Sequence, residues 1–332
     1  MASPTPKTEL KVVMGAMTFG EKGKEGARVH DLNDVAAILD EFQKHGHAEV
    51  DTAIAYTGGT SEEYLGKLNW QKRGLIVETK LYPSAGRKHT REGIREYYGR
   101  SLKALNADSI DLFYLHGPDR TTPWEETFKA CDELHKEGKF KKLGISNYQA
   151  WEVAEIVMLC RANGWIQPTV YQGLYNAIHR GVEPELFPCL RKFGISFYEF
   201  NPLGGGFFTG RYTSKDTVPE EGSRFDSSKG TSQARNYRAR YWNDQYFKAL
   251  EIISKAAADN NLTMAETALR WVNHHSLMKK EFGDAIIIGA SSVKHIRENL
   301  IDLEKGPLPE AVVKAIDEAW DVVKGNIANY WH

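Results

Sequence analysis

Residues 50–66 read VDTAIAYTGGTSEEYLG. The first half alternates apolar residues as a strand does, and SEEYLG resembles the start of a helix after a glycine pair. Asp51 and Tyr56 stand where the strand runs out, and strand ends carry the catalytic side chains in barrels of parallel strands. The stretch therefore predicts one strand–helix unit that ends in functional residues.

Similar units fill the rest of the sequence. Short apolar runs alternate with helical patterns, which favours a parallel sheet that is buried on both faces. Eight units predict an α/β fold of the (β/α)8 TIM-barrel type, with a long polar loop at 204–243 after the seventh strand and an extra C-terminal helix at 310–323. A doubly wound open sheet is the alternative, and the lack of a linker predicts a single domain over residues 1–332. The expected strands span residues 10–17, 47–56, 75–82, 109–117, 142–148, 169–176, 195–203 and 285–291.

The charge balance and the cysteines argue against several classes of partner. The chain has 43 basic and 44 acidic residues, a net charge of −1, so no bulk field attracts nucleic acid or a membrane surface. It has no apolar run of about 18 residues, and its start, MASPTPKTEL, lacks the apolar core of a signal peptide. Cys131, Cys160 and Cys189 are odd in number and include no CxxC pair, which argues against disulfides and zinc. We expect a cytoplasmic protein that binds no metal, nucleic acid or membrane.

Polar side chains gather at the ends of the second, third and fourth expected strands. Asp51 and Tyr56 follow the second strand, Lys80 ends the third in VETKL, and His116 ends the fourth in FYLHG. Taken alone, each has a structural explanation, such as a turn cap, a packing aromatic or a solvated strand end. Together they form a chemical unit, because a lysine in a partly buried site needs a counter-charge and Asp51 supplies one.

The chemistry of this unit suits reduction of a carbonyl group. The charge of Lys80 is expected to lower the pKa of the Tyr56 phenol from about 10, which would make Tyr56 a general acid near neutral pH. His116 can donate a hydrogen bond to a substrate oxygen. A proton donor beside an oxyanion site serves carbonyl reduction when a hydride source lies alongside.

The hydride source is expected at the loops after strands seven and eight. The sequence has no Rossmann GxGxxG at the start of a βαβ unit, and barrels bind phosphates with these two loops instead. Here they read NPLGGGFFTGR and GASSVKHIREN, which are rich in glycine, serine and basic residues. Ser146, Asn147 and Gln172 are candidates to hold a carboxamide, and Phe200 offers a stacking face.

These motifs resemble those of the aldo-keto reductase superfamily over nearly the whole chain. Its Asp, Tyr, Lys and His tetrad maps onto Asp51, Tyr56, Lys80 and His116, and GISNY, YQGLYN and FNPLGGGFFTGRY also correspond. Within the superfamily the chain is most similar to the aflatoxin-aldehyde and succinic-semialdehyde reductase group, through LHGPDRTTPWEETFKACDELHKEGKF and NGWIQPTVYQGLYN. The resemblance implies NADPH-dependent reduction of aldehydes and some ketones to alcohols, with the cofactor extended across the barrel mouth. It also makes a homodimer the assembly to test.

The resemblance further implies which residues contact the cofactor and the carbonyl substrate. The implied substrate contacts are Tyr56, His116, Arg240 and His332. The implied cofactor contacts are Met17, Asp51, Ser146, Asn147, Gln172, Phe200, Asn201, Leu203, Gly205, Arg211, Arg224, Ser291, Lys294, His295, Glu298 and Asn299.

The sequence departs from the superfamily's pattern at the 2′-phosphate of NADPH. Many members have a lysine and an arginine there, where this chain has Gly289 and His295, with Lys294 as a substitute cation. The preference for NADPH over NADH is therefore expected to weaken above the histidine pKa, about 6.5 when unperturbed.

A second departure concerns the substrate. Members of the group usually have an arginine where this chain has His332, which is mostly neutral at pH 7.5 if its pKa is about 6.5. Turnover of a carboxylate-bearing aldehyde is then expected to improve as the pH falls toward 6. If RNYRARYW is instead a solvated surface loop, Arg240 has no part in binding the substrate.

Two other functions remain open on the sequence alone. Potassium-channel β subunits share the fold and the tetrad but act mainly as binding partners, although nothing like their long N-terminal extension precedes the first expected strand. A reductase dedicated to one biosynthetic pathway is the other alternative. A panel of aldehydes read by NADPH absorbance separates these functions.

Overall fold

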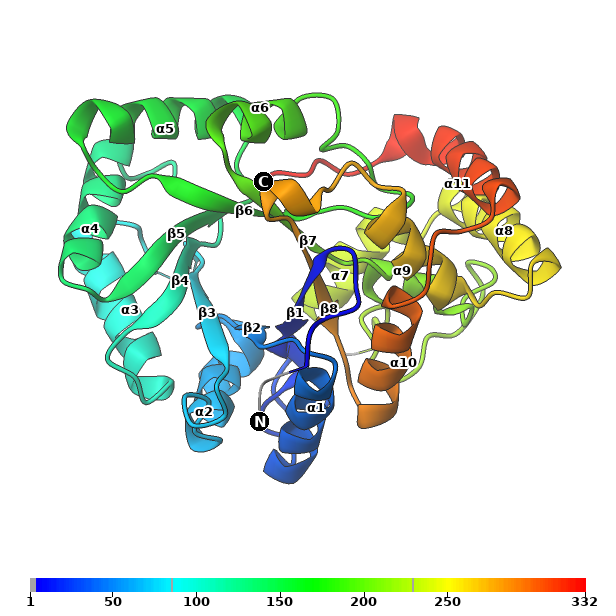
Figure 1. Ribbon diagram of the computed structural model, residues 1–332, viewed down its shortest axis with the longest axis horizontal. Coiled ribbons are helices and arrows are strands. Elements are labelled where there is room, and N and C mark those ends of the chain that lie inside the picture. The colour runs from blue at the N-terminus through cyan, green and yellow to red at the C-terminus, as the bar shows by residue number, and fades with distance from the viewer. Residues whose placement is uncertain (1–3, 85, 229) are drawn as a thin grey trace.

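The computed structural model describes residues 4–84, 86–228 and 230–332. Its strands close into a barrel in which each strand pairs in parallel with the next and β8 returns to β1 (Figure 1). The barrel expected from the sequence is therefore confirmed. The strands are β1 (Lys11–Gly15), β2 (Glu49–Asp51), β3 (Ile76–Leu81), β4 (Ile110–Leu115), β5 (Phe140–Ser146), β6 (Pro168–Leu174), β7 (Ser196–Phe200) and β8 (Ala285–Gly289).

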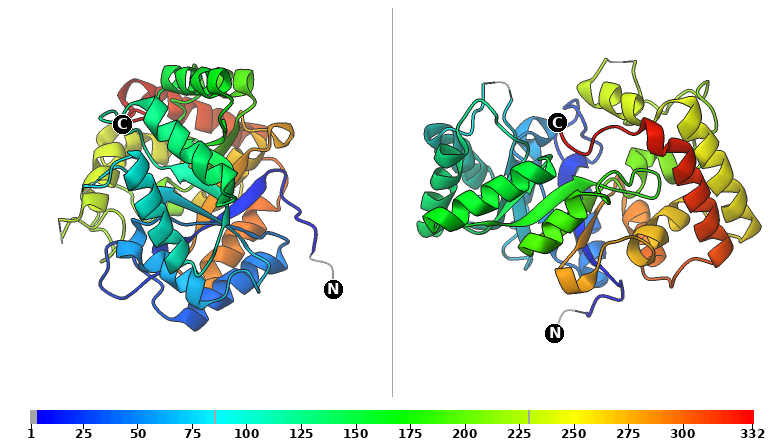
Figure 2. Two further views of the ribbon diagram at one scale, coloured as in Figure 1. Left: turned by 90° about the vertical axis from the view of Figure 1, so that its left-hand side faces the viewer. Right: turned by 90° about the horizontal axis from the view of Figure 1, so that it is seen from above.

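Helices connect the strands and cover the outside of the barrel (Figure 2). The extra helix α11 packs against α8 beside the barrel, as both views show. The helices are α1 (Leu32–Lys44), α2 (Thr60–Lys67), α3 (Arg91–Ala104), α4 (Trp124–Lys136), α5 (Ala150–Asn163), α6 (Leu186–Phe193), α7 (Ser232–Tyr241), α8 (Asp244–Asp259), α9 (Met264–His274), α10 (Val293–Leu303) and α11 (Glu310–Val323).

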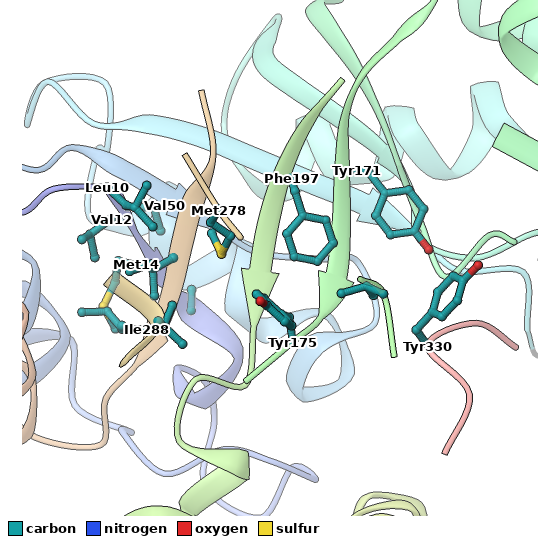
Figure 3. Packing of buried hydrophobic residues seen from close by; sticks show 14 of the residues in the cluster. Leu10, Val12, Met14, Val50, Tyr171, Tyr175, Phe197, Met278, Ile288 and Tyr330 are labelled. Carbon is teal, nitrogen blue, oxygen red and sulfur yellow. The ribbon is translucent and has the colours of Figure 1, made fainter. Parts of the chain in front are cut away.

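Two packed layers hold the barrel together. The outer layer lies between strands and helices, and Figure 3 shows part of it around β1, β6, β7 and β8. The inner layer fills the barrel and includes Tyr114, which needs Gly144 opposite because a Cβ there would overlap the tyrosine ring. The buried apolar residues of the inner layer are Val13, Leu112, Tyr114, Val170, Tyr198, Ala285 and Ile287.

The segment after β7 is not the continuous loop that its polar sequence predicts. Residues 204–243 contain the 3-10 segment η3 (Gly204–Thr209) and the helix α7. Thr231 caps α7 by accepting a hydrogen bond from the Ala234 N–H. Tyr237 and Tyr241, four residues apart, are buried on one face of the helix. The burial of these two rings stabilises a helix in a segment whose polar composition suggested a loop.

The segment after α11 runs back to β6 and crosses toward the barrel mouth (Figure 1). The Ala328 carbonyl lies 2.9 Å from His179 Nε2, and the Ala150 N–H donates to the Tyr330 hydroxyl at 3.2 Å. The His332 N–H donates to the Asn147 carbonyl at 3.3 Å, which brings the His332 side chain to the mouth. Within the described ranges, no helix combines the length and the apolar character needed to cross a membrane.

Candidate active site

The four residues of the expected tetrad meet at the C-terminal ends of β2, β3 and β4. Lys80 is fully buried, and its Nζ lies 2.7 Å from Asp51 Oδ2 and 3.2 Å from the Tyr56 hydroxyl. The same ammonium donates to the Thr52 carbonyl at 2.6 Å. The ring of His116 meets the Tyr56 ring edge-on, with 5.8 Å between centroids. Parallel strands thus bring together side chains that are up to 65 residues apart, Asp51 and His116.

The surroundings of Tyr56 raise the pKa of its phenol, whereas the sequence predicted a lowered pKa. Burial raises the pKa of the Tyr56 phenol above its ordinary value, although the positive charge of Lys80 opposes this. The expectation of a lowered phenol pKa is therefore wrong for the protein without ligand, because desolvation outweighs the nearby charge. Burial pulls the pKa of Lys80 down, but the charge of Asp51 and the contact with Tyr56 leave it raised, so the ammonium persists.

His116 is held as a neutral imidazole. Burial lowers its pKa well below the ordinary value, and the charge of Lys80 lowers it further. Its Nδ1 is buried without a hydrogen-bond partner among the described residues. Its backbone is fixed on both sides, because its N–H donates to the Leu81 carbonyl at 2.9 Å and its carbonyl accepts from Asn147 Nδ2 at 2.8 Å. A neutral ring can donate one hydrogen bond to a ligand oxygen.

A cavity of about 970 Å³ opens above this group. Tyr56, His116, Arg240 and His332 line it, as do all the expected cofactor contacts except Ser146. Ser146 is fully buried, and its Oγ accepts a hydrogen bond from Asn147 Nδ2 at 3.0 Å. It therefore orients Asn147 instead of facing the cavity. Lys80 is also absent from the lining because it lies behind Tyr56.

The loop after β7 forms one wall of the cavity. Asn201 adopts a left-handed backbone (φ 70°), and its Oδ1 accepts from the Tyr237 hydroxyl at 2.8 Å while its Nδ2 is buried without a partner in the described chain. Arg224 donates to the same Tyr237 hydroxyl. Gly205 (φ 69°) is required beneath Tyr237, because a Cβ would overlap the tyrosine ring. The glycine run thus lets the loop lie close under α7.

Basic residues line the far part of the cavity, and the pKa of one of them, His295, is lowered. Burial lowers the pKa of His295, and the charge of Arg211 lowers it further. The weakening of the NADPH preference that was expected near pH 6.5 should therefore occur at a lower pH, and it stays a prediction. His295 Nδ1 instead lies 3.0 Å from Ser291 Oγ. Lys294 is largely exposed, and Arg28, which the sequence did not single out, also lines the cavity.

Arg240 projects from α7 into the same cavity as Tyr56. Its Nε is buried and has no hydrogen-bond partner among the described residues, and its guanidinium lies 5.8 Å from the Tyr237 ring centroid. RNYRARYW is thus part of a helix whose Arg240 lines the cavity, which corrects the surface-loop alternative. Burial lowers the pKa of His332, and the charge of Arg240 adds to this. The gain expected for acidic substrates on moving from pH 7.5 to 6 should therefore require a lower pH.

Tyr82 is a cavity residue that the sequence reasoning missed. It lies between His116 and His332, with ring centroids 5.5 and 5.7 Å away. A signal was present, because Tyr82 stands two residues after Lys80 and the period of a strand places both on one face. Arg28 and Tyr237 carried no comparable signal, since both lie outside the strands.

Comparisons with known proteins identify the family of this chain. The model of the Aldo/keto reductase family matches residues 11–321. An aldo-keto reductase of Pseudocercospora fijiensis (strain CIRAD86) is 52% identical over 89% of this chain and 100% of its own. The aldo-keto reductase pigE of Monascus ruber is 44% identical over the full length of both chains. Aflatoxin B1 aldehyde reductase member 2 of Homo sapiens is 44% identical over 99% of this chain and 91% of its own. The expected likeness to aflatoxin-aldehyde reductases is confirmed, and the chain belongs to the aldo/keto reductase family of carbonyl-reducing oxidoreductases.

Proposed function

We propose that the protein reduces aldehydes, and some ketones, to alcohols with NADPH, and that Tyr56 is the proton donor. The observation that carries this proposal is the buried Lys80 ammonium, which contacts the Asp51 carboxylate and the Tyr56 hydroxyl beneath a large cavity. The family uses nicotinamide cofactors and reduces carbonyl groups. The proposal goes beyond this family assignment in two respects: it names NADPH as the cofactor, and it gives each residue a role.

The residues of the cavity fit a nicotinamide dinucleotide. Asn201 Nδ2 is a buried donor that needs an acceptor, and Phe200 lines the wall beside it. Arg28, Arg211 and Arg224 supply positive charge for phosphates along the cavity. Asn147 and Gln172 would hold the carboxamide near Tyr56. When bound, the cofactor supplies the hydride.

Residues of the protein would then supply the proton and stabilise the charge that develops on the carbonyl oxygen. Because its pKa is raised, Tyr56 keeps its proton at neutral pH and would donate it to the carbonyl oxygen as negative charge develops there. Lys80, 3.2 Å away, would stabilise the resulting tyrosinate. The neutral His116 would donate a hydrogen bond to the same oxygen and orient the substrate. Asp51 would hold Lys80 in place as its counter-ion.

Consumption of NADPH with nitrobenzaldehyde tests this function. We expect steady turnover that depends on the aldehyde, with the corresponding alcohol as the product. NADPH binding without turnover across a panel of aldehydes would favour a binding role like that of channel β subunits.

Three free thiols support the proposal of a cytoplasmic location. A single domain and a homodimer remain predictions. Sedimentation at several concentrations would test the dimer.

Arg240 is proposed to bind the carboxylate of acidic aldehydes. We expect Arg240→Ala to lower kcat/KM for succinic semialdehyde by roughly 10- to 100-fold. This is the loss expected when one hydrogen bond between two charged groups is removed. The same variant should change kcat/KM for nitrobenzaldehyde by less than about threefold, because that substrate lacks the anion. Because the pKa of His332 is lowered, the ratio between the two substrates should stay flat from pH 7.5 to 6.

Arg238→Ala is the matched control for this measurement. Arg238 lies on the same helix but donates to the Phe225 carbonyl at 3.3 Å and does not line the cavity. It should leave the ratio of the two substrates unchanged. Equal losses for both substrates in Arg240→Ala would show that Arg240 supports folding or cofactor binding instead.

A further inference from the structure

The side chain of Arg120 joins two separate parts of the chain at the edge of the cavity. Arg120 lies between β4 and α4, and its Nε and Nη2 donate to the two carboxylate oxygens of Glu152, at 2.7 and 3.0 Å. Its third nitrogen, Nη1, donates to the main-chain oxygen of His332 at 3.1 Å. One guanidinium group therefore bonds helix α5 and the segment 327–332 at the same time. The function proposed above gives Arg120 no part.

Glu152 provides Arg120 with a fixed anchor. It is the third residue of α5, and no part of its side chain is exposed. Its Oε2 also accepts the Gln149 N–H at 2.8 Å, which closes the capping box at the start of the helix. Two parallel hydrogen bonds to this immobile carboxylate fix the plane of the guanidinium group. Nη1 is thereby directed at His332 by a rigid support.

The main chain of His332 is held from two sides. Its N–H donates to the Asn147 carbonyl at 3.3 Å, and its oxygen accepts from Arg120. The His332 ring lines the cavity and lies beside the Tyr82 ring, with 5.7 Å between centroids. Arg120 thus supplies one of these two main-chain hydrogen bonds, which keep the His332 ring in the cavity wall.

The preceding residues of the segment are held by other contacts. The Ala328 carbonyl lies 2.9 Å from His179 Nε2. The Tyr330 hydroxyl accepts from the Ala150 N–H at 3.2 Å and donates to the Glu185 carboxylate. These contacts do not involve Arg120, so they should keep the segment docked as far as Tyr330 when Arg120 is changed. Loss of Arg120 should therefore free only the part of the segment that lies next to the cavity.

We propose that Arg120 is a positioning residue for substrate binding, which uses the buried Glu152 as its anchor and holds His332 in the wall of the cavity. This inference rests on the proposed function, which places the aldehyde in that part of the cavity. Without Arg120, the His332 ring can move away from Tyr82, and the wall beside the substrate is incomplete for part of the time. The aldehyde should then bind more weakly, whereas the proton donor and the cofactor contacts stay in place.

Arg120→Met tests this role by removing all three donors. KM for nitrobenzaldehyde should rise roughly three- to tenfold, the range expected for the loss of one partly exposed hydrogen bond. Both kcat and the Kd for NADPH should stay within about twofold of the wild type. Arg120→Lys keeps a cation beside Glu152 but replaces the planar group by a single nitrogen, so KM should rise here too. If Arg120→Met does not fold, Arg120→Lys decides the question.

A double variant shows whether Arg120 acts through His332. His332→Ala removes the ring from the cavity wall and should itself raise KM for nitrobenzaldehyde. Adding Arg120→Met to His332→Ala should raise KM by less than about twofold more, because both changes weaken the same part of the wall. If the two effects multiply in full, Arg120 acts on the substrate by another route and the proposal is overturned.

Arg191→Met and Arg191→Lys are the matched controls. Arg191 on α6 donates from Nη1 and Nη2 to the two oxygens of Asp284, at 3.0 and 2.5 Å. The Asp284 side chain is also fully buried, and it accepts the N–H of Phe197 near the start of β7, at the end of the barrel away from the cavity. Both Arg191 variants should leave KM within about twofold. An equal rise in KM would trace the effect to an unpaired buried carboxylate and overturn the proposal.

NMR of histidine-labelled protein follows His332 directly and needs no aldehyde. Its signal is the one that is absent from His332→Ala, and the ring current of Tyr82 should shift this signal in the wild type. The shift should decrease in both Arg120 variants and persist in both Arg191 variants. An unchanged His332 signal, or an unchanged KM, in both Arg120 variants would overturn the proposal. If the wild type reduces no aldehyde while the His332 signal still depends on Arg120, the proposed function fails and the holding of His332 by Arg120 is supported.

Discussion

Tyr56→Phe should abolish most of the reductase activity while the protein stays folded and still binds NADPH. The change removes only the hydroxyl, so the ring contact with His116 persists and the cavity keeps its shape. Loss of a general acid typically lowers the rate by about 10²- to 10⁴-fold, and we expect kcat for nitrobenzaldehyde to fall by at least this range. Stopped-flow NADPH absorbance measures the rate, and quenching of protein fluorescence measures the cofactor Kd, which should change by less than about threefold.

Tyr82→Phe is the control for loss of a phenol in the same cavity. Tyr82 faces His116 from another side, and none of the hydrogen bonds that the structure gives for Lys80 goes to it. Its kcat should stay within about fivefold of the wild type. Near-normal turnover by Tyr56→Phe would refute the assignment of the proton donor, and His116 would then be the next group to test.

Asp51→Leu should destabilise the protein by about 3–5 kcal/mol, the usual cost of leaving one partner of a buried ion pair unpaired. Lys80 is fully buried, and without Asp51 its ammonium keeps, among the described residues, only the Thr52 carbonyl and the Tyr56 hydroxyl as partners. Because no part of the Lys80 side chain is exposed, water cannot screen the remaining charge. Urea unfolding at pH 7, followed by circular dichroism, measures the change in the free energy of unfolding.

The double variant Asp51→Leu/Lys80→Met provides the comparison. Replacing both charges by apolar groups of similar size removes the buried charge, so most of the lost stability should return although activity does not. A loss below about 1 kcal/mol in Asp51→Leu would show that Lys80 gives up its proton when Asp51 is absent. If the double variant is as unstable as Asp51→Leu, the loss of stability comes from altered packing and not from the unpaired charge of Lys80.

The sequence predicted the barrel and the meeting of the four tetrad residues, because both follow from local pattern. Period-two strands fix which side chains point inward, and parallel pairing brings Asp51, Lys80 and His116 to one rim. Whether charge or desolvation dominates at Tyr56 depends on how deeply the fold buries it, which no local pattern records. Likewise, the polar composition of α7 predicted a loop, although the spacing of Tyr237 and Tyr241 by one helical turn is typical of a helix.

The position of α7 links the two ligands of the cavity. The Tyr237 hydroxyl on this helix donates to Asn201 in the wall proposed to hold the cofactor, and Arg240, three residues further on, lines the same cavity and is proposed to bind the substrate. A ligand that ordered the helix through Tyr237 would also lower the entropy that Arg240 loses when it binds a carboxylate. If the cofactor strengthens binding of the acidic substrate in this way, thermodynamic reciprocity requires that the substrate strengthen cofactor binding by the same factor. A neutral aldehyde, which makes no use of Arg240, would lack this cooperativity.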